Sequence, residues 1–188
     1  MKSLPRATSL AHQWIAERLS PGDHAIDATC GNGHDTKFLA ECVGASGSVL
    51  AIDLQPEAIA ATRDRCAAID CRIRYEVADH ARLAEFLEPE TQTQAIMFNL
   101  GYLPTGDKSV ITQPESTVCA IEAAIHRLAV GGLMTLAVYT GHPGGGEEAA
   151  AVSTFVTVLD QSTFGVVQYG FLNQENNPPH LIGIERRR

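Results

Sequence analysis

The chain has 188 residues, 45% of them hydrophobic and 19% charged, which is ordinary for one globular domain. Its 14 Lys and Arg against 22 Asp and Glu give a formal net charge of −8, which argues against coating nucleic acid or an anionic membrane by charge alone. Five cysteines without a C-x-x-C pair and seven histidines without H-x-x-x-H spacing favour free thiols and no metal. With no bilayer-length apolar run and no signal peptide, we expect a single cytoplasmic domain over residues 1–188.

Short β-branched runs alternate with amphipathic or Ala-rich segments along the chain. An opening helix is predicted over Thr8–Leu19, ended by Pro21 and Gly22, and is expected to cover the functional site. The predicted strands are His24–Thr29, Ser48–Asp53, Arg72–Val77, Ala95–Leu100, Leu133–Tyr139, Val166–Leu172 and His180–Glu185. The later helices are predicted over Asp35–Cys42, Pro56–Ile69, Ala81–Leu87, Pro114–Leu128 and Gly146–Leu159.

This alternation predicts an α/β fold with a doubly wound, mostly parallel seven-stranded sheet. The last two strands are joined by Asn173–Pro179, which is too short for a crossover helix, so they should form a C-terminal antiparallel hairpin at one edge. A dinucleotide-binding fold would continue instead with a sixth parallel strand. The pattern therefore favours the Rossmann-like fold of class I methyltransferases.

A glycine loop follows the first predicted strand, in the segment DATCGNGHDT of residues 27–36. Gly31 and Gly33 let the backbone turn tightly and approach a ligand, and the next helix presents free N–H groups. Ligands of open α/β sheets bind outside the carboxyl ends of the strands, where this loop is expected to lie. The alternative is a plain turn before a capped helix.

Acids at three successive strand ends identify the expected cofactor. Asp53 follows Gly33 by 20 residues, where a carboxylate can bind ribose hydroxyls, and Asp79, before His80, is placed for the adenine amine. Asp27 would repel a pyrophosphate but suits an ammonium group. Each acid by itself could be a solvated strand end. Together they favour S-adenosylmethionine over a nicotinamide cofactor.

The fourth strand ends in Asn99-Leu100-Gly101-Tyr102, which partly matches enzymes that methylate exocyclic amines. In those enzymes an Asp or Asn and an aromatic residue flank two spacers, often prolines. An Asn oxygen can accept from the amine and aim its lone pair at the methyl group, while the ring stacks on the base. The alternative is an Asn-Gly turn with a packed Tyr.

The fifth strand leads into Tyr139-Thr-Gly-His142 and three glycines, and then Glu147 and Glu148. His142 is placed to relay a proton from the substrate amine, although a loop His can also have no catalytic role. The two Glu residues are expected to complement the N-terminal end of the next helix. The amide-rich linker of residues 171–179 either reads base edges or forms a polar turn.

These motifs resemble a family known as "putative rRNA methylases", whose characterised members are tRNA methyltransferases that convert 5-aminomethyl on a wobble 2-thiouridine into 5-methylaminomethyl. The resemblance extends over almost the whole chain. It rests on DATCGNGHDT (27–36), DLQ (53–55), NLGYLPTGD (99–107) with Lys108, YTGH (139–142) and FLNQEN (171–176). Thr140 stands where members often have a histidine, so a two-histidine relay is not implied.

The resemblance implies an S-adenosylmethionine site made by Asp27, Thr29, Cys30, Gly31, Asn32, Gly33, Asp35, Thr36, Asp53, Leu54, Gln55, Asp79, His80 and Asn99. The implied catalytic residues are Asn99, Tyr102, Tyr139 and His142. The implied substrate-binding residues are Tyr102, Lys108, His142, Asn173 and Asn176.

The expected function is thus N-methylation of the aminomethyl group on the tRNA wobble uridine. The alternatives are another RNA base such as one in rRNA, a small-molecule amine, or a non-catalytic binding module. The expected partner is a tRNA anticodon loop, held in a small footprint by Arg6, Lys37, Lys108, Arg127 and the Arg186–Arg188 tail. A homodimer is a further expectation, because one small domain offers little surface for an anticodon stem.

Overall fold

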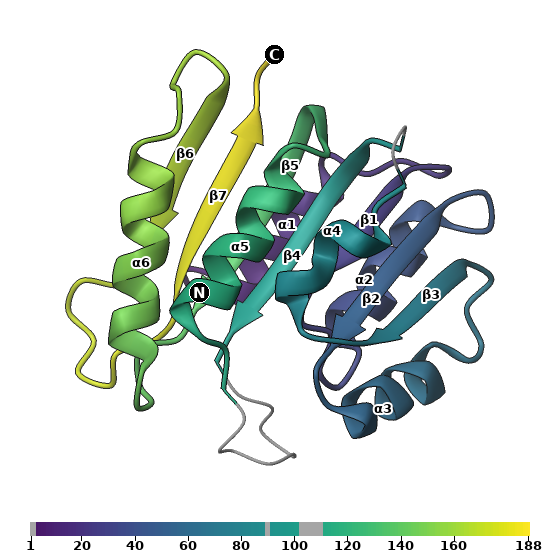
Figure 1. Cartoon of the computed structure of the whole chain (residues 1–188), viewed down its shortest axis with the longest axis horizontal. Coiled ribbons are helices and arrows are strands. Elements are labelled where there is room, and N and C mark those ends of the chain that lie inside the picture. The colour runs from purple at the N-terminus through teal and green to yellow at the C-terminus, as the bar shows by residue number, and fades with distance from the viewer. Residues whose placement is uncertain (1–2, 89–90, 102–110) are drawn as a thin grey trace.

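The computed structural model describes residues 3–88, 91–101 and 111–188 (Figure 1). One seven-stranded sheet is formed by β1 (His24–Asp27), β2 (Ser48–Asp53), β3 (Arg72–Val77), β4 (Thr93–Leu100), β5 (Leu128–Val138), β6 (Phe164–Tyr169) and β7 (His180–Arg186). The helices are α1 (Ala7–Ala16), α2 (His34–Val43), α3 (Pro56–Cys66), the 3₁₀ helix η1 (His80–Arg82), α4 (Leu83–Phe86), α5 (Pro114–Ile125) and α6 (Gly145–Thr157). Among the described residues, no helix combines the length and apolar character that crossing a membrane requires.

The strand order is β3-β2-β1-β4-β5-β7-β6. Strands β1 to β5 are parallel to one another, whereas β7 is antiparallel to both β5 and β6. The predicted sheet with an antiparallel hairpin at one edge is therefore confirmed. The chain first builds outward from β1 to β3 and then crosses to β4, so the order reverses between β1 and β4. Such a switch point leaves a crevice outside the carboxyl ends of the strands.

Helices cover both faces of the sheet (Figure 1). Successive residues of β4 point to opposite faces, as the pleat requires. Ile96 and Phe98 join a core with α4, α5 and α6, while Ala95 and Met97 join a core with α1 and α2. Helix α3 packs on Ala51 of β2, on the same side as α2. Burial on both faces explains why the central strands read as continuous apolar runs.

Several predicted boundaries differ from the observed ones. Strand β5 begins at Leu128 rather than Leu133, because Leu128 pairs with Thr93 and the register then shifts. Gly131 adopts a left-handed φ of 79° within this irregularity. The irregular first part of the strand therefore lacks the sequence pattern by which a strand is recognised. Helices α1 and α3 end three residues earlier than predicted. Strand β6 is shifted toward the N-terminus and ends at Tyr169.

Candidate active site

A cleft of about 840 Å³ opens at the carboxyl ends of β1 to β5. Its floor is the loop after β1 and the ends of β2 and β4, which places it at the switch point of the sheet. Helix α1 contributes Thr8, Ser9 and His12 to one wall, and the turn before β7 contributes Asn176 to Pro179. Segments from both ends of the chain therefore line one cleft.

The glycine loop at the floor is held by bonds to two neighbouring elements. Gly31 has a left-handed φ of 49°, and its N–H donates to Asp53 Oδ2 at 2.9 Å. The Thr62 hydroxyl of α3 donates to the Gly31 carbonyl at 3.0 Å. A Cβ on Gly33 would lie 2.7 Å from the Thr62 Cα, so only glycine allows this approach of loop and helix. The loop is fixed before any ligand binds.

Two of the three predicted strand-end acids line the cleft, Asp53 and Asp79. Asp53 accepts from the backbone N–H groups of Gly31 and Gln55, and burial nevertheless raises the pKa of its carboxyl. Asp79 accepts from the Ala81 N–H at 2.8 Å and thereby caps η1. Each carboxylate keeps lone pairs for a ligand, because an oxygen can accept more than one bond.

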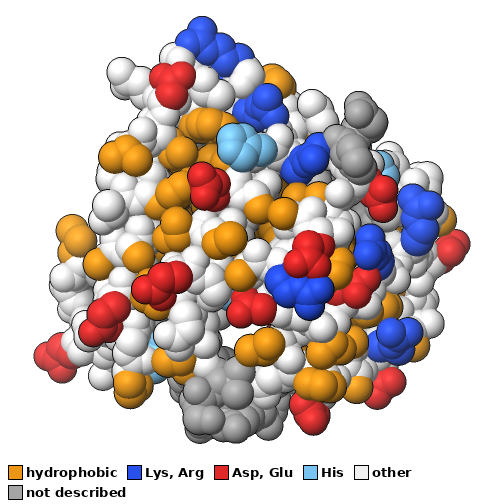
Figure 2. Space-filling view, in the orientation of Figure 1, with side chains coloured by type: hydrophobic (Ala, Val, Ile, Leu, Met, Phe, Trp, Pro, Cys, Tyr) orange, Lys and Arg blue, Asp and Glu red, His pale blue; other side chains and the backbone are white. Residues whose placement is uncertain are grey.

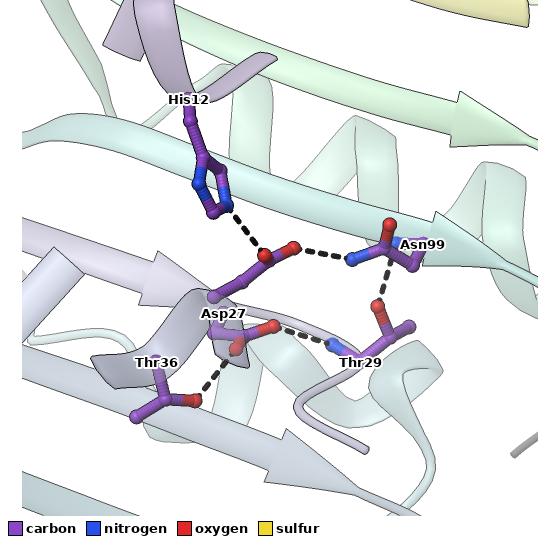
Figure 3. Close-up of polar contacts among 6 residues, drawn as sticks. His12, Asp27, Thr29, Thr36 and Asn99 are labelled. Carbon is purple, nitrogen blue, oxygen red and sulfur yellow. Dashed lines mark hydrogen bonds and ion pairs between the residues drawn. The ribbon is translucent and has the colours of Figure 1, made fainter. Parts of the chain in front are cut away.

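The third acid, Asp27, is buried and does not line the cleft. Its Oδ2 accepts from the Thr36 hydroxyl at 2.6 Å, as Figure 3 shows, and Oδ1 faces the Thr29 N–H at 3.4 Å. Burial, with a contribution from the Asp35 charge, raises the pKa of Asp27 to about 8. In this position the carboxyl braces the start of the loop. The acid that faces the cleft beside it is Asp35, in the first turn of α2.

Asn99, the penultimate residue of β4, forms hydrogen bonds through both its main chain and its side chain. Its N–H donates to Thr29 Oγ1 at 2.7 Å, and its side-chain Nδ2 donates to Asp35 Oδ2 at 2.5 Å (Figure 3). The other Asp35 oxygen, Oδ1, accepts from His12 Nε2 at 2.7 Å. Because Nδ2 is directed at Asp35, the amide oxygen is the atom that Asn99 presents on its other side. An acceptor therefore stands at the end of β4, on the cleft wall.

The wall near η1 contains buried polar groups. His80 packs edge-on against Phe98, and its Nε2 lies 3.3 Å from Thr117 Oγ1. Burial lowers the pKa of this imidazole, which favours its neutral form. Glu148, at the start of α6, is fully buried and accepts from the hydroxyls of Thr112 and Thr117. Its carboxylate thus ties α6 to α5 rather than standing at an exposed helix end.

The opposite wall holds Tyr139, His142 and Asn176. His142 Nδ1 donates to the Pro143 carbonyl at 3.0 Å, so in the neutral ring Nε2 is the basic nitrogen. Burial and the Asp35 charge raise the pKa of the Tyr139 phenol, which keeps its proton. Of these two candidates for accepting a proton, His142 is therefore the suitable one.

Most of the predicted site residues meet in this cleft. Those that line it are Thr29, Cys30, Gly31, Asn32, Asp35, Asp53, Leu54, Gln55, Asp79, His80, Asn99, Tyr139, His142 and Asn176. Asp27, Gly33 and Thr36 are buried and do not line the cleft, and Asn173 is exposed outside it. Tyr102 and Lys108 lie outside the described residues.

Some cleft residues carried no sequence signal. His12 comes from a helix that reads only as amphipathic, and its contact with Asp35 joins positions 23 residues apart. Thr112, Gln113 and Ser116 line the cleft near the start of α5. Such residues are ordinary helix-start residues in a sequence, so only the packing of α5 beside η1 identifies them.

The predicted basic footprint is divided between the two ends of the sheet. Arg127 precedes β5, and Arg186 Nη1 donates to the Leu128 carbonyl, so both lie at the end of the sheet away from the cleft. The C-terminus lies at that same end in Figure 1. On the face in Figure 2, Lys and Arg side chains are interspersed with Asp and Glu and form no continuous patch. Arg6, the N-cap of α1, and Lys37 of α2 remain, and both of these helices contribute residues to the cleft.

Known proteins of similar sequence and structure extend over nearly the whole chain. The sequence model of the family described as "Putative rRNA methylase" matches residues 49–185, and that of protein-L-isoaspartate (D-aspartate) O-methyltransferase matches residues 1–83. The chloroplastic tRNA (mnm(5)s(2)U34)-methyltransferase of Arabidopsis thaliana is 36% identical over 192 residues, covering 96% of this chain and 70% of that protein.

Two solved structures have nearly the same fold over their whole length. A "putative rRNA-methylase" from Clostridium thermocellum is 37% identical, with a TM-score of 0.94 over 98% of this chain and 100% of that chain. A "putative methyltransferase" from Streptococcus mutans, in complex with SAH, is 36% identical, with a TM-score of 0.88 over 98% and 99% of the two chains.

The strand order, the cleft at the switch point and the similarity to these known proteins together define the class of protein. It is a class I methyltransferase that depends on S-adenosylmethionine. The described cleft fits this cofactor, because the carboxylates of Asp35, Asp53 and Asp79 line it and can accept from ribose hydroxyls, an amine and an ammonium group. Within this class, the chain belongs to the "Putative rRNA methylase" family, whose sequence model matches most of its length.

Proposed function

We propose that this enzyme transfers a methyl group to the 5-aminomethyl nitrogen of the wobble uridine, with or without a 2-thio group, in tRNA. The observation that carries the proposal is Asn99, which lines the cleft and whose amide NH₂ is held by Asp35, so that its oxygen is left for a ligand. An acceptor at this place can orient the hydrogens of an amine. The name of the Arabidopsis relative, which is 36% identical, supports the choice of substrate.

The charge of the cleft suits a cationic substrate group. Asp35, Asp53 and Asp79 line it, and the described lining contains no Lys or Arg. A carboxylate-rich cleft stabilises an ammonium group and repels phosphates. We therefore place the aminomethyl group inside the cleft and the RNA backbone outside it, where Arg6, Lys37 and Lys108 are the expected contacts.

The cofactor would be held by residues at successive strand ends. We assign Asp53 to the ribose hydroxyls, Asp79 to the adenine amine, and the loop from Thr29 to Asn32 to the methionine part. Asp35, which faces the cleft where Asp27 does not, is the better placed partner for the cofactor's ammonium. When bound, S-adenosylmethionine supplies an electrophilic methyl group on a sulfonium.

Proton removal is the chemical task left to the protein. The amine enters as an ammonium ion, which has no lone pair, and we assign His142, whose side chain lines the cleft, to accept one proton. The freed lone pair then forms the N–C bond while the S–C bond of the methyl donor breaks, and its electron pair stays on sulfur. Asn99 and Tyr139 hold the amine in line, so positioning supplies most of the rate.

The deciding experiment uses purified enzyme, S-adenosylmethionine and tRNA that carries unmethylated 5-aminomethyl groups. We expect conversion to 5-methylaminomethyluridine, detected by mass spectrometry of the nucleosides. Asn99→Ala should retain binding of the cofactor product SAH in calorimetry but lose turnover, about 100-fold or more. Full turnover by this variant would mean that the Asn99 segment is only a structural turn.

Two other substrates are distinguished by the same assay. The net charge of −8 favours a small-molecule amine, which needs no RNA-binding surface. Methylation of free 5-aminomethyluridine as fast as of tRNA would favour this alternative. Methyl transfer to rRNA transcripts but not to tRNA would indicate another RNA base. A homodimer stays a prediction, which sedimentation velocity of the free protein and of its tRNA complex would test.

A further inference from the structure

Three side chains from three separate elements form a continuous chain of hydrogen bonds beside the cleft. His12 belongs to α1, Asp35 to the first turn of α2 and Asn99 to the end of β4. His12 Nε2 donates to Asp35 Oδ1 at 2.7 Å, and Asn99 Nδ2 donates to Asp35 Oδ2 at 2.5 Å (Figure 3). All three residues line the cleft, and the sequence motifs identified only the last two.

The carboxylate of Asp35 determines which way the Asn99 amide faces. An ionised carboxylate only accepts, so it bonds the NH₂ end of the amide and excludes the oxygen from that position. A rotation of half a turn would place the amide oxygen against Asp35 and would present N–H donors to the incoming amine. An ammonium group has only donors, so this flipped amide could not orient it. The Asp35 contact therefore decides whether Asn99 can act.

His12 holds Asp35 in the position that makes this contact. The imidazole lies flat on the Phe38 ring, with centroids 4.0 Å apart and planes at 4°. Its helix is anchored by Ala11 and Ile15, which are buried against the sheet. The side chain of Asp35 is 12% exposed and that of His12 33%, so the bond between them is partly shielded from water. Removal of the imidazole would leave one Asp35 oxygen without its protein donor.

We propose that His12 is a positioning residue for methyl transfer, which acts through Asp35 to keep the Asn99 oxygen turned to the substrate amine. This inference rests on the role of Asn99 in the proposed function. Helix α1 thereby has a chemical role besides covering the cleft, because it carries the first member of the chain of bonds. The Asn99 N–H, bonded to Thr29 Oγ1, keeps the main chain in place while the side chain is controlled separately.

The first test compares His12→Ala with His126→Ala, an exposed histidine at the end of α5. We expect His12→Ala to lower kcat about 10- to 100-fold, while KM for tRNA and Kd for SAH change less than about threefold. His126→Ala should leave all three unchanged. Unchanged kcat in His12→Ala, or loss of SAH binding in parallel with kcat, would overturn the proposal.

A charge swap tests the direction of the bonds. Asp35 is also assigned to the cofactor's ammonium, so its variants are assayed at saturating S-adenosylmethionine. In Asp35→Asn the new amide can offer either end to Asn99, so we expect kcat to fall as in His12→Ala. In the double variant Asp35→Asn/Asn99→Asp, His12 donates to the new amide oxygen, the new NH₂ donates to the new carboxylate, and an acceptor again faces the amine. Recovery of at least about tenfold in kcat over Asp35→Asn is the expected result. If kcat of the double variant is no higher than that of the slower single variant, the proposed action of His12 through Asp35 on Asn99 is contradicted.

A measurement without turnover separates this proposal from the substrate assignment. In ¹⁵N-labelled protein, the side-chain NH₂ signals of Asn99 are assigned from their loss in Asn99→Asp. We expect them to shift in His12→Ala and to stay in place in His126→Ala. If wild-type enzyme methylates no tRNA but these signals shift, the substrate assignment is wrong and the control of Asn99 by His12 stands. Unshifted signals with an active wild-type enzyme would refute only the control of Asn99 by His12.

Discussion

Single residues in this site work because their polar atoms already have partners before a ligand arrives. Asp53 is held by two backbone N–H groups, and Asp35 by His12 and Asn99. A buried carboxylate without donors would be costly, whereas one that is held keeps its remaining lone pairs aimed at the cleft. The same arrangement reduces the side-chain ordering that binding would otherwise require.

The first prediction concerns Asp53. Replacing Asp53 with Ala should weaken binding of S-adenosylmethionine and SAH about 10- to 100-fold or more, because charge-assisted bonds to two ribose hydroxyls are lost. Asp70→Ala, at an exposed acid, is the matched control and should bind normally. Isothermal calorimetry measures both. Wild-type affinity in Asp53→Ala would refute the ribose assignment.

The second prediction concerns the stability of the ligand-free protein and pH. The pKa of Asp27 is raised from 3.8 to about 8, so the folded state binds this proton more tightly than the unfolded state does. Stability from this group is therefore complete below pH 3.8 and is lost as the pH rises toward 8, by up to about 1.4 kcal/mol per pH unit.

Urea unfolding between pH 5 and pH 9 checks this sign, with Asp27→Asn as the comparison, since the amide keeps the shape without titrating. The difference in free energy of unfolding between the wild type and Asp27→Asn should shift in favour of the variant as the pH rises. A difference that is constant over this range would show that Asp27 does not titrate there.

At the scale of elements, helices bring groups to the cleft that the strands alone do not provide. Helix α1 supplies His12, α2 supplies Asp35, and the loop into α6 supplies His142. His142 is enclosed by glycines: a Cβ on Gly101 would lie 3.4 Å from its Nε2, and one on Gly145 would lie 3.0 Å from the same atom. The glycines of two motifs therefore make room for one imidazole.

The third prediction compares neighbouring glycines at the start of α6. A Cβ on Gly145 would meet the Tyr139 carbonyl at 2.5 Å, whereas one on Gly146 has nothing within 4 Å. Gly145→Ala should displace His142 and lower kcat at least about tenfold. Gly146→Ala should keep full activity and stabilise the helix by about 0.4–1 kcal/mol. Equal kcat for the two variants would show that the position of His142 does not limit the reaction.

At the scale of the whole molecule, charge is distributed so that few cations are near the cleft. The net charge is −8, and Arg127 and the C-terminal arginines lie at the far end of the sheet. We therefore expect electrostatic attraction to RNA to depend on a few residues, among them Arg6, the N-cap of α1, and Lys37 on α2. We expect such a surface to bind one loop of RNA rather than a long duplex.

The fourth prediction is a shallow salt dependence of tRNA binding. Each phosphate contact contributes a slope of about −0.7 in log K against log salt on single-stranded RNA, so two or three contacts give a slope of about −2. Arg6→Glu should weaken tRNA binding several-fold, and Arg188→Glu, at the far end, should not. Fluorescence anisotropy over a salt series measures both, and a steep slope or an equal effect of the two variants would contradict this footprint.

Much of the fold could be predicted because its signals are local. Runs such as Ser48–Asp53 and Arg72–Val77 were placed correctly to the residue, since turn residues and helix starts flank them. The irregular β5 was not, because its bulge depends on pairing with β4. For the site, the glycine loop and the acids Asp53 and Asp79 could be located, because the carboxyl ends of parallel strands always meet at one edge.

Local sequence patterns were therefore enough to predict the class of sheet, the edge at which a ligand is expected and the residue types at that edge. Which of these residues face the cleft depends on how the elements pack. One position along the chain separates buried Asp27 from cleft-lining Ala28, and packing of α1 brings His12 to Asp35. The basic composition of the C-terminal tail predicts a contact with RNA, but β7 is antiparallel to β5 and places the tail arginines at the end of the sheet away from the cleft. The physical reason is that charge and residue type can be read at each position of the sequence. The direction of a side chain and its distance from the cleft depend instead on how elements far apart in the sequence pack together.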